Sequence, residues 1–79
     1  MKSVDEFVSE GFHCLIDGKY EESEEACRMA IATDPNHCGA WLVLSVTLFL
    51  CRQFTEAIEA RLKADKLYDQ LIQEQDKTP

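Results

Sequence analysis

Apolar residues recur along the chain at intervals of three and four, which is the spacing of one face of an α-helix. The pattern is divided into four helix-length segments by Gly18, by Asp34-Pro35-Asn36 and by Arg52-Gln53. We predict helices over residues 3–17, 20–33, 38–51 and 54–74. No segment shows the strict alternation of a half-buried strand over a comparable length, so the pattern predicts an all-α fold.

The helix boundaries have specific chemical causes. Ser3-Val4-Asp5-Glu6 forms a capping box, in which the Ser oxygen accepts from a backbone N–H and the Glu side chain reaches back. Gly18 is a natural stop for the first helix. Asp34-Pro35-Asn36 ends the second helix, because Pro has no N–H to donate and restricts the residue before it. Arg52 and Gln53 make a short connection to the fourth helix.

The chain repeats itself when it is shifted by 34 residues. The matching positions carry the same kinds of residue: Phe7 and Trp41, Gly11 and Ser45, Tyr20 and Phe54, Ala26 and Ala60, and Ala30 and Ala64. Small residues let two helices approach closely, and aromatic residues fill the space beside them. Two helix–turn–helix units with this period resemble the tetratricopeptide repeat family.

The resemblance implies one domain over residues 1–79, with a first repeat at 4–37, a second at 38–71, and a helix end with a frayed tail at 72–79. It also implies four antiparallel helices and a role in protein–protein interaction. Gly39-Ala40-Trp41-Leu42 is similar to the small tetratricopeptide chaperones of type III secretion, which bind their clients through apolar concave faces.

Several positions depart from the family pattern. Ser23 stands where the family has Ala, and Cys27 and Arg61 stand where it has a large apolar residue. Asp69 replaces the Pro that would end the second repeat, so nothing stops the fourth helix there. We expect this helix to continue and to act as a cap on the array, with residues 75–79 frayed.

The third helix is apolar on all sides and must be covered on more than one. The family resemblance implies that one stripe, which includes Leu44 and Leu48, packs against the fourth helix. By the family geometry, a second stripe joins residues of the first helix on the inner, concave face. The predicted protein-binding residues are Val8, Phe12, Leu15, Ile16, Leu42, Val46, Phe49 and Leu50.

These residues predict a non-enzymatic interaction module, an adaptor or chaperone that holds an apolar or amphipathic helix of another protein. The alternative is a structural module that covers the same face with its own copy in a homodimer. The family's carboxylate clamp is not expected, because Val8, Phe12 and Val43 stand where its Lys, Asn and Arg residues would be.

The net charge and the composition limit the classes of partner that the chain is expected to bind. The chain of 79 residues has 15 acidic and 8 basic residues, a net charge of −7. This balance argues against nucleic-acid backbones and anionic membrane surfaces as partners. The longest apolar stretch, residues 39–51, is too short to span a bilayer, and residues 1–6 do not form a secretory signal. We therefore expect a cytoplasmic protein whose four cysteines are free thiols.

Catalytic and metal-binding readings rest on the cysteines and histidines. His13 precedes Cys14, and His37 precedes Cys38. These neighbours suggest catalysis by a Cys/His pair, and a Cys/His metalloprotein is a further alternative. The four cysteines are 11 to 13 residues apart, whereas a zinc site favours paired ligands two to four residues apart. We expect no catalytic residues, no cofactor and no metal.

Overall fold

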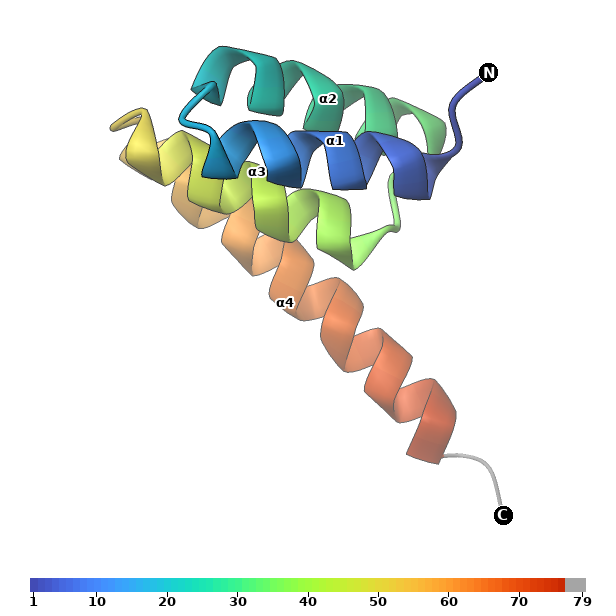
Figure 1. The fold of residues 1–79 in the computed structure, drawn as a ribbon. Helices are drawn as coiled ribbons and strands as arrows, with labels where there is room; N and C mark the ends of the chain where they lie inside the picture. The colour runs from blue at the N-terminus through green and yellow to red at the C-terminus, as the bar shows by residue number, and fades with distance from the viewer. Residues whose placement is uncertain (77–79) are drawn as a thin grey trace.

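A computed structural model describes residues 1–76, which form four α-helices (Figure 1). The helices are α1 (Val4–Ile16), α2 (Tyr20–Thr33), α3 (Cys38–Leu50) and α4 (Phe54–Asp76). The prediction of an all-α fold with four helices is confirmed. The third helix ends one residue earlier than predicted, because Cys51 is its C-cap. The capping box at the start of α1 is present in both directions.

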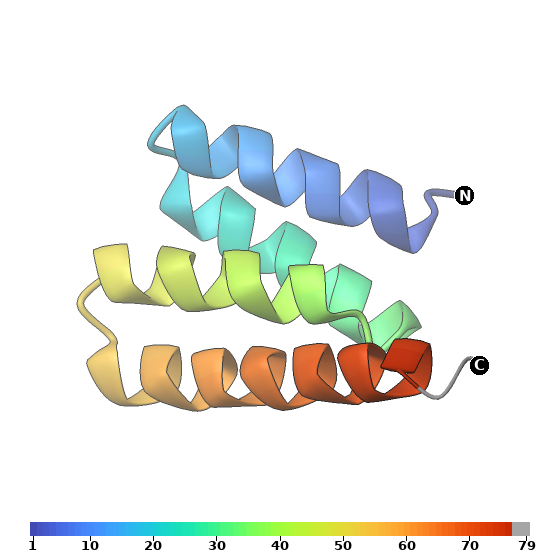
Figure 2. The same cartoon turned by 90° about the horizontal axis from the view of Figure 1, so that it is seen from below.

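The helices form two antiparallel pairs that stack on each other. Helices α1 and α2 pack along one another, α3 and α4 do the same, and α3 also contacts α2 and α1 (Figures 1 and 2). The indole N–H of Trp41 donates to the Pro35 carbonyl at 2.7 Å, which ties α3 to the link that precedes it. The second pair is therefore held directly against the first.

The 34-residue repeat extends to the turn inside each pair. The Gly18 N–H donates to the Leu15 carbonyl at 3.1 Å, and the Arg52 N–H donates to the Phe49 carbonyl at 3.0 Å. Gly18 and Arg52 both have a positive φ, 78° and 64°. Since α1 and α3 also have the same bounds after the shift, the two pairs share one backbone plan.

The core lies between the two pairs and is built from small and aliphatic side chains. Its central cluster contains Cys27 from α2, Leu44 and Leu48 from α3, and Ala57 and Ala60 from α4. The stripe of α3 that was expected to pack against the fourth helix is buried there. Alanines let the helices approach closely enough to exclude water from this layer.

Three more small residues are buried between the helices. Ala30 and Ala64, which the repeat pattern aligns, are 0% and 4% exposed. A Cβ added at Gly11 would meet the Cys27 sulfur at 2.9 Å, so α1 lies too close to α2 there for any larger residue.

Helix α4 is longer than predicted and runs past the other three helices (Figure 1). Residues 75 and 76, which we expected to be frayed, are helical, and the rest of the expected frayed tail, 77–79, lies outside the described residues. Leu67 is buried, whereas Tyr68, Leu71 and Ile72 beyond it are exposed. The extension therefore presents a row of apolar side chains to solvent.

Candidate functional site

The eight predicted binding residues lie on α1 and α3, which contact each other. We call this set the inner face. Six of its side chains are exposed, namely Phe12, Ile16, Leu42, Val46, Phe49 and Leu50. Val8 and Leu15 are half-buried. The most exposed are Ile16 at 65% and Phe49 at 59%, so these large apolar groups are mostly in contact with water.

The apolar surface of α3 follows from the composition of that helix. Leu44 and Leu48 fill the core, and the other sides of a helix with no charged residue must then face outward. Ser45 and Thr47, the two hydroxyl residues of the helix, are both buried. The Phe49 ring contacts the Phe54 ring edge to face, with 5.3 Å between centroids, so the apolar surface continues onto the start of α4.

A groove runs between α3 and α4 and adjoins the inner face. It holds about 320 Å³, and its lining residues are Ser45, Val46, Phe49, Ala57, Ile58, Arg61 and Leu62. We call it the α3–α4 groove. Ile58 and Leu62 form its α4 wall and are 60% and 62% exposed. Val46 and Phe49 belong to both the groove and the inner face.

Arg61 brings a positive charge into this apolar groove. Its Nε donates to the Asp65 carboxylate at 3.0 Å, one turn further along α4. A guanidinium carries five N–H donors, so this pairing leaves it able to bind a second acceptor. The site thus combines apolar walls with one cation.

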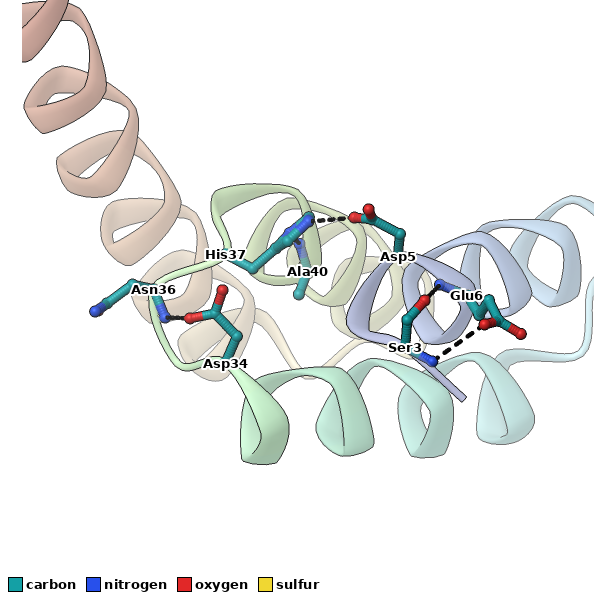
Figure 3. A network of polar contacts seen from close by, with 7 residues as sticks. All are labelled: Ser3, Asp5, Glu6, Asp34, Asn36, His37 and Ala40. Atoms are coloured by element: carbon teal, nitrogen blue, oxygen red, sulfur yellow. Dashed lines mark hydrogen bonds and ion pairs between the residues drawn. The ribbon is translucent and has the colours of Figure 1, made fainter. Parts of the chain in front are cut away.

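Two polar contacts of His37 connect α1 to the start of α3 (Figure 3). His37 precedes α3, and its Nδ1 accepts from the Ala40 N–H at 3.2 Å. Its Nε2 lies 3.1 Å from the Asp5 carboxylate on α1. Because Nδ1 is the acceptor, Nε2 carries the hydrogen and donates it to Asp5. This contact links the starts of the two helices that carry the inner face.

Three further hydrogen bonds lie in the same region of the molecule (Figure 3). The Ser3 and Glu6 side chains each accept from the other's backbone N–H at 3.2 Å, which fixes the start of α1. The Asn36 N–H donates to the Asp34 carboxylate at 3.0 Å in the link before α3.

The four cysteines are free thiols, and Cys27 is the one buried among them. Burial raises the pKa of the Cys27 thiol to about 11, which keeps it protonated and weakly nucleophilic at neutral pH. Cys14, Cys38 and Cys51 are half-buried and free. Among residues 1–76, no group of three or more His, Cys, Asp or Glu side chains could hold a metal ion.

The described part of the chain contains no helix with the length and apolar character that a membrane crossing needs. Comparison with protein-family models, with curated proteins and with solved structures finds no match.

Sequence reasoning missed the α4 side of the α3–α4 groove. Ile58 and Leu62 fall 34 residues after Glu24 and Arg28, which form an ion pair at 2.9 Å on α2. The replacement of a charged pair by an apolar pair was visible in the repeat alignment. That change, between positions equivalent by the repeat, is the signal that could have identified the groove.

Proposed function

We propose that the chain is a non-enzymatic protein–protein interaction module that holds an apolar or amphipathic helix of a partner on its inner face. The observation that carries this proposal is the exposure of six large apolar side chains on two adjacent helices. Fully burying one side chain of this kind yields about 1.5–3 kcal/mol, so a partner helix that covers several of them gains substantial binding energy.

The two-helix repeat adds to this proposal. By its resemblance in sequence to tetratricopeptide repeats, the module would act as an adaptor or as a chaperone for a client protein. Four free thiols fit a reducing compartment such as the cytoplasm. The α3–α4 groove beside the inner face is apolar and contains one cation, Arg61. An acidic peptide or a nucleic acid would need several positive charges, so this surface suits an apolar or amphipathic helix better.

The second candidate is a homodimer formed through the same face. It is favoured by the composition of the inner face, whose side chains are all apolar and can therefore complement an identical surface in a symmetric contact. In this arrangement Phe12→Glu would bury an unpaired carboxylate and abolish the dimer.

Capture from cells tests both candidates. The wild-type chain should retain specific proteins, and the double variant Phe12→Glu with Leu42→Glu should lose them, because each carboxylate would have to be desolvated. Glu21→Lys, a charge change on α2 away from the inner face, is the matched control and should behave as wild type. Equal retention by all three proteins would reject the inner face as a binding surface.

A further inference from the structure

The inner face has two distinct ends. Helices α1 and α3 run in the same direction, so their starts lie at one end of the face and their last turns at the other (Figure 2). Each helix has 13 residues and spans about 20 Å. Helix α3 contains no charged residue, so the middle of the face carries no charge from that helix.

Asp5 places a negative charge at the start of the inner face. It stands three and seven residues before Val8 and Phe12, on the same side of α1. One of its carboxylate oxygens lies 3.1 Å from His37 Nε2 (Figure 3). The Asp5 side chain is 90% exposed, and a carboxylate can accept several hydrogen bonds, so Asp5 can also accept from a donor of a bound partner.

Arg52 places a positive charge at the opposite end. It directly follows Cys51, the C-cap of α3. It also stands between Phe49 and Phe54, whose rings contact edge to face, so it borders the apolar surface. Arg52 is exposed, and its guanidinium has no hydrogen bond or ion pair within residues 1–76. All five of its N–H donors are therefore available to a partner.

The backbone at Arg52 is a second sign that this side chain has a role. Its φ of 64° lies in the left-handed region, which is strained for a residue with a Cβ. The equivalent turn has Gly18 at this position, and α1 and α3 still have equal lengths, so a side chain is not needed to end the helix. Strain of this kind is typical of functional positions.

The other charges near these ends are already balanced. Asp17 and Lys19 have opposite charges and line one pocket that contains no inner-face residue. On α1, Glu6 belongs to the capping box and Glu10 pairs with Lys2. One negative charge thus remains at the start of the inner face and one positive charge at its end.

We propose that Arg52 and Asp5 set the direction and the end charges of the helix that the inner face binds. The bound helix runs antiparallel to α1 and α3, with an acidic residue of its first turn at Arg52 and a basic residue of its last turn at Asp5. Acidic first turns and basic last turns also suit the helix dipole, so both effects favour this direction. The inference rests on the proposed function and specifies the chemistry of its partner.

Two synthetic peptides with the same composition provide the test. Each is an amphipathic Leu/Ala/Gln helix of about 18 residues with blocked ends, long enough to span the face. The first carries Glu in its first turn and Lys in its last turn, and the second has these exchanged. Fluorescence anisotropy should show that the wild-type chain binds the first about tenfold more tightly at low salt. The preference should shrink as salt screens the charges.

Arg52→Gly separates recognition from folding. It removes the guanidinium and relieves the strained backbone, so the preference for the first peptide should fall about threefold or more while the melting temperature does not fall. Arg52→Lys keeps the charge and should retain part of the preference. Lys66→Gln removes one positive charge from an exposed position of α4 and is the matched control, whose preference should equal that of wild type. The helix content of each peptide is the same for every protein, so it does not affect these comparisons.

The possible outcomes distinguish this inference from the proposed function. A wild-type preference that is unchanged in Arg52→Gly would overturn the inference. Equal binding of both peptides that is lost in the double variant Phe12→Glu with Leu42→Glu would also overturn it, and the proposed function would stand. Binding of neither peptide by the wild-type chain would count against both.

Discussion

The hydroxyl oxygens of Ser23 and Thr47 lie 2.8 Å apart between α2 and α3, and both side chains are fully buried. Ser23 Oγ is also 2.8 Å from the Gly11 carbonyl on α1, and Thr47 Oγ1 is 2.8 Å from the Val43 carbonyl. Two hydroxyl hydrogens thus serve three contacts, so the position of each hydrogen depends on the other. Ser23 thus links α2 to α1 and to α3 through its single hydroxyl group.

This hydroxyl pair should be energetically coupled. Ser23→Ala and Thr47→Val should each lower the free energy of unfolding by about 1 kcal/mol, the net worth of a typical hydrogen bond. The double variant should lose less than the sum, by about 0.5 kcal/mol or more, because either single change already breaks the shared contact. Urea unfolding of the four proteins measures this. Effects that add fully would show that the hydroxyls act independently.

The two equivalent turns predict opposite responses to substitution. Arg52 has a φ of 64°, where a side chain costs about 1–2 kcal/mol. Arg52→Gly should therefore raise the free energy of unfolding by up to about 1 kcal/mol, after the greater freedom of the unfolded chain is subtracted. Gly18→Ala should lower it by a similar amount, since Gly18 has a φ of 78°. Thermal unfolding is the measurement, and a lower melting temperature for Arg52→Gly would contradict the turn geometry.

Ala64 should tolerate no larger residue. It is 4% exposed and lies in α4 on the side that faces the core. Ala64→Leu should lower the free energy of unfolding by about 1–3 kcal/mol, because added methylenes force neighbouring side chains from their preferred rotamers. Ala32→Leu at an exposed position of α2 is the control and should change it by no more than about 0.5 kcal/mol. Equal melting curves for the two variants would reject this placement of Ala64.

Cys27 should make stability depend on alkaline pH. Its pKa is raised by burial from 9.0 to about 11, so the thiol ionises in the unfolded chain at a lower pH than in the folded one. The contribution to stability is fully present below pH 9 and is lost as pH rises toward 11, by at most about 2–3 kcal/mol. The wild type should therefore lose its advantage in urea midpoint over Cys27→Ala as pH rises from 9 to 11. A constant difference would show that the thiol is not desolvated.

The helices could be predicted from sequence because their signals are local. The capping box at Ser3, the positive-φ residue Gly18 and the proline at 35 each act within one turn of the chain. The end of α4 could not be predicted, since nothing near residue 74 opposes a further turn. The Ser23–Thr47 contact was also hidden, because its two residues lie 24 positions apart and meet only when α3 packs on α2.

The candidate site was partly predictable. Phe12 and Phe49 could be assigned to an exposed face only through the geometry that the resemblance to tetratricopeptide repeats implies, because α3 is apolar on all sides. Ile58 and Leu62 fit the pattern of an ordinary amphipathic helix, so their exposure depends on the absence of a covering helix among the described residues. Whether a side chain is buried depends on how all the helices pack together, and the sequence pattern of a single helix does not reveal this packing.

Site-specific photo-crosslinking in cells tests the central claim, that the inner face binds protein, most directly. A photoreactive phenylalanine analogue replaces Phe12 in one variant and Phe49 in a second, and the control carries it in place of Glu21 on α2. The inner-face model predicts protein adducts at both inner-face positions and none at the control, with an adduct of twice 9.0 kDa if the partner is a second copy. Adducts no more abundant at Phe12 and Phe49 than at Glu21 would contradict it.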